Sequence, residues 1–201
     1  MTIGKILMSS LLGLLLLGFS HPQAEEKVLG GFSLRQALHR NSPFRELKWK
    51  NIGPTFCGGR VVDVEGYDLH PGKFWVATAT GGVWLTEDRG RTWRSAFDQE
   101  ATSSIGDIAI SQRDENLLWL GSGESNAHTY SFAGCGVFKS RDGGRSWRHM
   151  GLTATRHIAR IVIDPLDANT VYAAAAGNLF AAHAERGGYK AVDGGKSWEK
   201  A

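Results

Sequence analysis

The stretch SRDGGRSW at residues 140–147 has two near copies in the same chain, TEDRGRTW at 86–93 and AVDGGKSW at 191–198. The aspartates of the three copies stand at positions 88, 142 and 193, which are 54 and 51 residues apart. Self-similarity at a period near 50 residues indicates a protein built from repeated structural units. The repeated aspartate therefore either performs chemistry or holds a turn that every unit needs.

Each copy of the motif follows three short runs that are typical of β-strands. An alternating run is followed by a polar turn with Pro, Asp or Asn, and a second apolar run then leads through glycine into a third. In the middle unit the first two runs are IGDIAI (105–110) and LLWLGS (117–122), and the tryptophan of each motif begins a fourth strand. The helix candidate is SLRQALHR (33–40), which precedes the units. The sequence therefore predicts an all-β fold of four-stranded antiparallel β-propeller blades. It predicts about three of them, with the last incomplete, as part of a larger propeller.

Each residue type in the motif has a physical reason to occur in a tight hairpin. The aspartate can accept hydrogen bonds from backbone N–H groups of its own turn, and the glycine two positions later permits positive φ. The tryptophan can bury a large apolar face against the sheet. We therefore expect a structural role, and neither catalysis nor metal binding, for Asp88, Gly90, Trp93, Asp142, Gly144, Trp147, Asp193, Gly195 and Trp198.

The motif S-x-D-x-G-x-[ST]-W resembles the Asp box, or BNR repeat, of sialidase-like, xyloglucanase-like and sortilin-like β-propellers. A narrower resemblance covers most of residues 48–198. KWKNIGPTFCGGRVVDV (48–64) and HIARIVIDPLDANTVY (157–172) look like segments of large bacterial exported proteins similar to the sortilin N-terminal region and often labelled glycosyl hydrolases. The resemblance implies that the motif hairpins lie away from any ligand site, and that this chain is an N-terminal fragment of a longer protein.

The chain divides into three expected parts. Residues 1–24 have the layout of a secretory signal peptide, and their apolar run from Ile6 to Phe19 is shorter than the roughly 20 residues that span a bilayer. We therefore expect export (secretion, or a periplasmic location in a Gram-negative bacterium) and no stable membrane span after cleavage. Residues 25–47 are expected to be a leader or linker. Residues 48–201 are expected to be a partial propeller with blades at 48–98, 99–152 and 153–201, whose open edges favour self-association.

The charge pattern argues against a nucleic-acid partner, and the two cysteines leave open whether the chain contains a disulfide. The formal net charge is +3 with both signs interspersed, which is not the pattern of a nucleic-acid-binding protein. Cys57 and Cys135 are expected on the same face of adjacent blades, where a disulfide between them and two free thiols are both compatible with export. No metal or cofactor is predicted, because the sequence has no C-x-x-C, H-E-x-x-H or G-x-S-x-G motif.

Two of the loops between the second and third strands are long. They read GESNAHTYSFAGC (123–135) and GNLFAAHAERGG (177–188), whereas the corresponding connection of the first unit is brief. Long loops on a rigid scaffold often carry binding sites, although solvated polar loops are the alternative. The residues expected to face a ligand are Glu124, Asn126, His128, Tyr130, His183 and Arg186.

The residues give little support to catalysis. A sialidase of the resembled group carries an FRIP-like motif, and the nearest match is FREL (44–47). A xyloglucanase-like inverting enzyme needs two carboxylates, and Ala79 stands where those enzymes have an aspartate two residues before Gly-Gly. The sequence favours an exported, non-enzymatic binding or scaffold module for a peptide, protein or polysaccharide ligand, with no catalytic residue assigned. The alternative is a xyloglucanase- or sialidase-like glycoside hydrolase whose catalytic half lies outside this chain.

Overall fold

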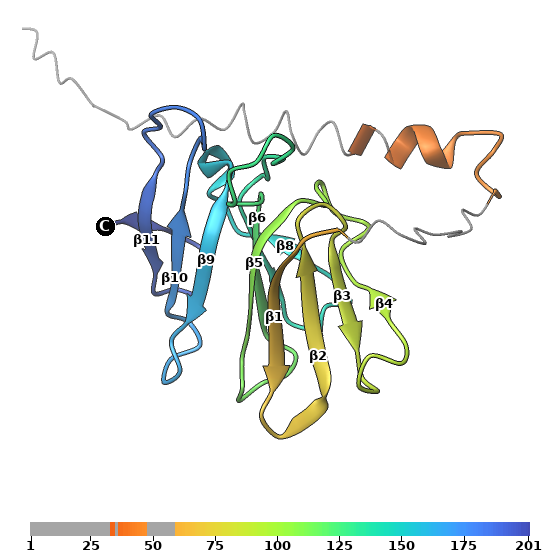
Figure 1. Cartoon of the computed structure of the whole chain (residues 1–201), viewed down its shortest axis with the longest axis horizontal. Coiled ribbons are helices and arrows are strands. Elements are labelled where there is room, and N and C mark those ends of the chain that lie inside the picture. Colours follow the sequence, from red (N-terminus) through yellow and green to blue (C-terminus); the bar gives the residue numbers. More distant parts are fainter. Residues whose placement is uncertain (1–32, 35, 48–58) are drawn as a thin grey trace, which may run out of the picture.

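The computed structural model describes residues 33–34, 36–47 and 59–201, and it builds residues 59–201 as three four-stranded antiparallel sheets (Figure 1). In each sheet the strand order follows the chain order, so every neighbour in the sequence is also a neighbour in space. Among the described residues, the helical ones are 33–34, 36–40 and the short 3-10 turn Thr153–Thr155. The predicted all-β fold class is therefore confirmed.

The three sheets are called blades 1, 2 and 3. In each blade the first two strands have 5 to 9 residues, the third has 4 or 5, and the outer fourth strand has 2. Blade 1 contains β1 (Val61–Tyr67), β2 (His70–Thr78), β3 (Val83–Thr86) and β4 (Arg94–Ser95). Blade 2 contains β5 (Ile105–Ile110), β6 (Leu118–Ser122), β7 (Val137–Ser140) and β8 (Arg148–His149). Blade 3 contains β9 (Ile158–Ile163), β10 (Val171–Ala175), β11 (Gly187–Ala191) and β12 (Glu199–Lys200).

Blade 3 has the same four strands as the other two, which corrects the expectation of an incomplete last blade. Its outer strand β12 has 2 residues, the same length as β4 and β8. The reason is local, because in every blade the outer strand pairs with the third strand over two residues only. The few residues after Trp198 therefore suffice to complete the sheet.

The hydrophobic core lies between the blades, in two clusters. One cluster joins blades 1 and 2, and the other joins blades 2 and 3. Strands β5 and β6 of the middle blade are buried along their whole length, whereas β10 alternates between buried and exposed positions. Burial on both faces thus identifies blade 2 as the blade with a neighbour on each side. Within the part of the chain that the structure describes, blades 1 and 3 each keep one uncovered face.

The motif at 140–147 forms the turn between β7 and β8, and its aspartate is held by that turn. Asp142 Oδ1 accepts the backbone N–H groups of Arg145 (3.0 Å) and Ser146 (2.9 Å), while Oδ2 accepts the Ser146 hydroxyl (2.5 Å). Hydrogen bonding by Ser146 lowers the pKa of Asp142 to about 2, so the carboxylate stays ionised. Asp88 and Asp193 likewise accept the backbone N–H and the hydroxyl of the residue four positions later, Thr92 and Ser197.

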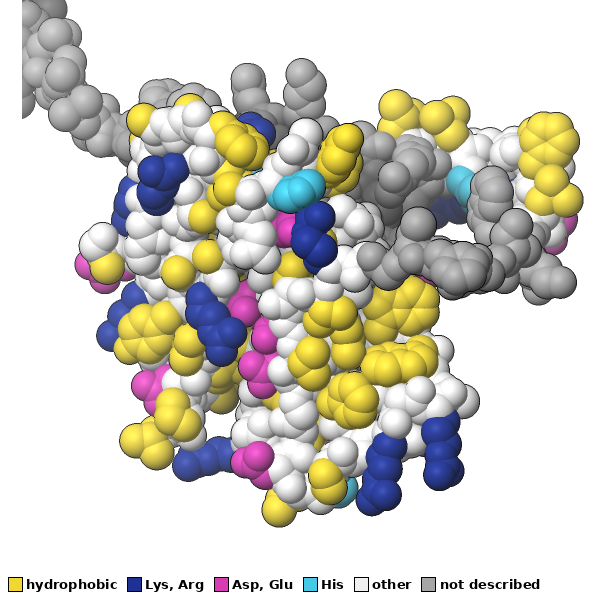
Figure 2. All heavy atoms as spheres, viewed as in Figure 1, with side chains coloured by type: hydrophobic (Ala, Val, Ile, Leu, Met, Phe, Trp, Pro, Cys, Tyr) yellow, Lys and Arg dark blue, Asp and Glu magenta, His cyan; other side chains and the backbone are white. Residues whose placement is uncertain are grey.

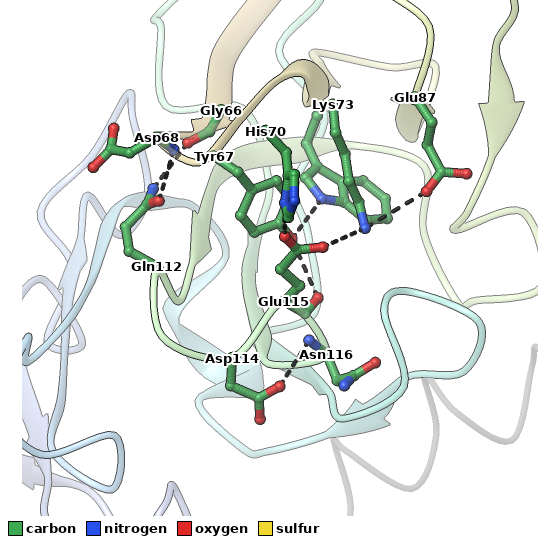
Figure 3. A network of polar contacts seen from close by, with 11 residues as sticks. Gly66, Tyr67, Asp68, His70, Lys73, Glu87, Gln112, Asp114, Glu115 and Asn116 are labelled. Atoms are coloured by element: carbon green, nitrogen blue, oxygen red, sulfur yellow. Dashed lines mark hydrogen bonds and ion pairs between the residues drawn. The ribbon is translucent and has the colours of Figure 1, made fainter.

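A second polar network ties blade 1 to blade 2 at the motif-bearing end of the sheets (Figure 3). Glu115 of blade 2 accepts hydrogen bonds from Lys73 (2.8 Å) and His70 of blade 1. Its backbone carbonyl accepts the Tyr67 hydroxyl at 3.2 Å. The Lys73 ammonium lowers the pKa of Glu115, as expected for an ion pair that favours the charged carboxylate. These side chains bind one another and hold the two turns together.

Candidate ligand-binding face

The loops expected to bind a ligand lie at the opposite end of the sheets from the motif turns. This placement follows from the antiparallel order, because the connection from the second to the third strand and the connection from the third to the fourth leave opposite ends. The β6–β7 connection and the β10–β11 connection both lie at the upper end in Figure 1. Two adjacent blades therefore present their long loops on one face, here called the loop-bearing face.

The β6–β7 loop is held in place by its own side chains. The Ser131 hydroxyl donates to the Asn126 carbonyl at 2.5 Å and accepts the backbone N–H of His128 at 2.9 Å. The Ser104 hydroxyl donates to the Phe132 carbonyl at 2.7 Å, which fastens the loop to the start of β5. A loop that is ordered before binding loses less conformational entropy when a ligand arrives.

Glu124 is the best-connected residue of this loop, and its position corrects the expectation that it faces a ligand. Its side chain is fully buried, and its carboxylate accepts hydrogen bonds from Arg60 Nε at 2.5 Å and from Arg60 Nη2. Its backbone N–H donates to Ser104 Oγ at 3.1 Å, and its carbonyl accepts the Nδ1–H of His157 at 2.7 Å. Glu124 therefore links three residues that directly precede β1, β5 and β9.

Glu124 and its partners Arg60, Ser104 and His157 are here called the clamp. The histidine of the clamp is neutral at neutral pH. Burial lowers the pKa of His157, against a smaller raising effect of its hydrogen bond to the Glu124 carbonyl. Because Nδ1 donates to that carbonyl, Nε2 carries no proton in the neutral ring. The charges of the clamp are then the Glu124 carboxylate and the Arg60 guanidinium, which neutralise each other.

The exposed side chains of the loop-bearing face include three large aromatic rings. Tyr130 is 68% exposed, Phe132 58% and Phe180 71%. The His128 ring lies 6.1 Å from the Tyr130 ring, centroid to centroid, with a tilt of 39°. Asn126 is exposed beside them. Of the residues expected to face a ligand, Asn126, His128 and Tyr130 are thus accessible.

The β10–β11 loop uses its arginine for internal support. Arg186 donates from Nε to the Ala176 carbonyl at 2.8 Å, and from Nη2 to the carbonyls of Asn178 (2.7 Å) and Ala181 (3.1 Å). His183 is half-buried, and its Nδ1 has no hydrogen-bond partner among the described residues. Arg186, which was expected to face a ligand, is exposed, and its guanidinium is bonded to its own loop.

A hollow of about 1050 Å³ opens on the same face. One side belongs to the helical segment before the blades, and the other belongs to blade 1 and to the β6–β7 loop. Its walls include Gln36, His39, Arg40, Thr80, Phe97 and Phe132. The exposed Phe132 ring therefore borders a space large enough for a small ligand or a short chain.

Three charged residues on the first strands of the blades were not among the predicted site residues. Asp63 on β1, Asp107 on β5 and Arg160 on β9 occupy equivalent positions, and Arg160 Nη1 lies 3.2 Å from Asp107 Oδ1 and 3.9 Å from Asp63 Oδ1. Burial, with a smaller contribution from the Asp63 charge, raises the pKa of Asp107 to about 7. The available signal was the recurrence of a charged residue at one position of three otherwise apolar runs.

Both aspartates bind the backbone of the following blade. Asp63 Oδ2 accepts the N–H of Ile108 at 3.3 Å, and Asp107 Oδ2 accepts the N–H of Ile161 at 2.7 Å. The Asp107 side chain is only 3% exposed. These carboxylates therefore act as connections between successive inner strands.

Some expectations fall outside the described residues. The expected signal peptide (1–24) lies there, and so does Cys57, while Cys135 is buried beside Gly136. Within residues 33–34, 36–47 and 59–201, no three His, Cys, Asp or Glu side chains are grouped as metal ligands. No helix in that part of the chain is long and apolar enough to cross a membrane.

Comparisons with known proteins support the fold. No family model and no curated protein matches the chain. The solved structures that it resembles include an ancestral GH74 enzyme (TM-score 0.56, 22% identity, 71% of this chain and 18% of that one). They also include the GH74 xyloglucanase of Xanthomonas campestris (TM-score 0.51, 19% identity, 71% and 21%) and YCF48 of Cyanidioschyzon merolae (TM-score 0.47, 17% identity, 73% and 41%).

The GH74 structures are β-propellers, so the predicted propeller fold is confirmed at the level of the fold. The aligned part amounts to about a fifth of each GH74 chain. Identities of 22% and 19% indicate a shared architecture and carry no information about a shared activity.

Proposed function

We propose that this chain is an exported Asp-box propeller module of the sortilin-like kind, which binds a glycan or an extended peptide on its loop-bearing face and catalyses no reaction. The observation that supports this proposal is the exposure of Tyr130, Phe132 and Phe180 on ordered loops of two adjacent blades. Large aromatic rings are usually buried, and they are enriched where a protein contacts a partner. A flat ring can cover either the apolar face of a sugar or an apolar side chain.

The Glu124 carboxylate is unsuited to acid–base catalysis. Glu124 is fully buried and accepts two hydrogen bonds from Arg60, whereas a general acid or base must reach the reacting atom. The retained alternative, a glycoside hydrolase, is favoured by one observation. Asp107 has its pKa raised to about 7, which is the direction that a general acid requires. Its carboxylate, however, accepts the Ile161 N–H and is shielded from solvent.

The binding proposal is tested with defined probes. Xyloglucan, a panel of other soluble polysaccharides and an array of immobilised peptides are presented to the purified chain, and binding is measured by biolayer interferometry. Replacement of Tyr130 or Phe180 by alanine should weaken binding of the positive probe about tenfold, as is common for an aromatic residue central to an interface. Leu166→Ala is the matched control, because Leu166 is 81% exposed but lies in the β9–β10 turn at the other end of blade 3.

Two results would refute the proposal. If no probe binds, or if both aromatic variants bind as tightly as the wild type, the loop-bearing face is not a binding site. If the chain releases reducing ends from any polysaccharide, and Asp107→Asn abolishes that release, the hydrolase alternative replaces the non-enzymatic one. Export is tested separately by N-terminal sequencing of the protein recovered outside the cytoplasm, where an intact Met1 would contradict signal cleavage.

A further inference from the structure

Successive blades are joined by one contact that is repeated at both interfaces. The motif turn of the following blade packs against an aromatic ring of the preceding blade. This ring is here called the seat of the preceding blade. At the first interface the Trp147 indole N–H donates to the Ala96 carbonyl at 2.7 Å, and Gly144 packs directly against the Trp75 ring. Trp75, the seat of blade 1, is fully buried.

The second interface repeats the contact with equivalent residues. The Trp198 indole N–H donates to the Met150 carbonyl at 2.7 Å, and Gly195 packs against the Trp119 ring. Trp119, the seat of blade 2, is fully buried, and the ammonium of Lys139 lies 4.5 Å from its ring centroid. Lys139 also donates to the Gly194 carbonyl at 2.9 Å. A motif turn and an aromatic seat thus form the joint at both interfaces, and a lysine joins it at the second, where Lys139 stands at the position that Leu85 has in blade 1.

Blade 1 carries a motif turn without a seat. Trp93 is 44% exposed, and its indole N–H donates to the Gly90 carbonyl of its own turn at 3.0 Å. The same face of blade 1 exposes 55% of Val64, with the partly exposed Phe74 and Trp84 on the neighbouring strands. Figure 2 shows a group of hydrophobic side chains over β1, β2 and β3.

Blade 3 carries a seat without a motif turn. Tyr172 on β10 occupies the position of Trp75 and Trp119, and it is 42% exposed. Lys190 on β11 occupies the position of Lys139, with its ammonium 5.5 Å from the Tyr172 ring centroid. Val162, which pairs with Tyr172 on β9, is 46% exposed. Among the described residues, the two uncovered faces are therefore the two halves of one joint.

We propose that two copies of this chain associate head to tail, with the motif turn of blade 1 in each copy packed on the Tyr172 seat of the other. Both interfaces then continue the joint already present inside the chain, with Trp93 in the role of Trp147 and Trp198. In the proposed pair, Lys190 of one copy faces the Arg89 carbonyl of the other copy. That carbonyl corresponds to the Gly194 carbonyl bound by Lys139. Arg89 has the positive φ (63°) of that position, as Gly194 does (74°).

The stoichiometry follows from symmetry and blade number. A head-to-tail contact makes a ring if it closes and a filament if it does not. Two copies together contain twice the three sheets of one chain. This number of blades lies within the range of about 4 to 8 that closed propellers contain. A closed pair covers both uncovered faces of each copy and leaves the loop-bearing face free, so this inference is independent of the proposed ligand binding.

The test measures the mass of the purified full chain by light scattering and sedimentation velocity over a series of concentrations. The wild type should have twice the mass of one chain. Trp93→Glu and Tyr172→Glu should each reduce the mass to that of one chain, because a buried charge without a partner is strongly unfavourable. Leu166→Glu is the control, since its side chain is exposed and belongs to neither face, and it should leave the mass doubled.

Mixing the two variants separates a head-to-tail contact from loss of folding. A 1:1 mixture of Trp93→Glu and Tyr172→Glu has one joint with both native faces, so it should regain the doubled mass that neither variant has alone. The proposal is overturned if the wild type stays a monomer at its highest concentration. It is also overturned if either variant still doubles, if the mixture does not recover, or if the mass grows beyond two copies.

Discussion

Gly144→Ala is the substitution that tests the joint between blades most directly. Gly144 has φ +72°, and a Cβ added there would lie 2.4 Å from Trp75 Cη2 and 3.1 Å from Cζ3. The Trp75 ring has no room to move away, because it is fully buried and its indole N–H donates to the Tyr67 hydroxyl at 3.2 Å. The added methyl group therefore meets both an unfavourable backbone conformation and a fixed ring.

The two costs have different magnitudes and can be separated. A non-glycine residue in the left-handed region costs roughly 1–2 kcal/mol. Forcing extra volume into a packed core costs about 1–3 kcal/mol more. Gly90→Ala is the matched control, because Gly90 has φ +83° but its Cβ would lie 3.5 Å from the nearest atom, an ordinary contact. The free energy of unfolding should fall about 1–3 kcal/mol further for Gly144→Ala than for Gly90→Ala.

The assay is urea-induced unfolding followed by tryptophan fluorescence, with both substitutions made in the Tyr172→Glu background. That background keeps two copies apart, so that Gly90 has no seat to contact in a second chain. Alanine raises the free energy of unfolding by restricting the conformations of the unfolded chain. This gain is common to both glycine-to-alanine changes and cancels when the two free energies of unfolding are subtracted. Equal losses of stability for the two variants would refute the inference that the motif glycine is required by its approach to the seat.

Three further predictions concern charged groups. Because the pKa of folded Asp107 is raised to about 7 from 3.8, its contribution to stability is full below about pH 4 and lost as the pH rises to 7; Asp107→Asn should flatten this fall in urea titrations. Because the pKa of Asp142 is lowered to about 2, its contribution is full above about pH 4 and lost on acidification; Asp142→Asn should remove this acid-side loss from thermal unfolding curves and lower the midpoint at pH 7. Arg60→Ala should lower the urea midpoint, and adding Glu124→Gln should restore part of it, because a neutral amide is easier to bury than an unpaired carboxylate.

The local part of the fold could be predicted because its causes are local. The role of Asp142 in its own turn depends on residues within four positions of it in the sequence. The short outer strand of blade 3 shows the limit of such reasoning. Its length is set by two-residue pairing with β11, and the sequence after Trp198 does not display that pairing.

The accessibility of the candidate site could be predicted only in part. Loop length predicted a binding face, which stays a prediction, and Tyr130 is exposed on that face. Glu124 was assigned to the ligand because an acidic residue in a loop is usually solvated. Its actual partner, Arg60, stands 64 residues earlier in the chain, and no local pattern connects the two. Asp107 was missed for the same reason, since its raised pKa results from burial between blades.

The sequence by itself determined the repeat, the strand order within each blade and the turn that closes it, because these depend on spacing and residue type over short distances. The tertiary structure decided which polar residues are buried and which faces remain uncovered. Those properties arise only when one blade packs on the next. Trp93, Trp147 and Trp198 belong to near-identical motifs, yet Trp93 is 44% exposed and the other two are packed on a preceding blade. Their difference comes from their neighbours in space.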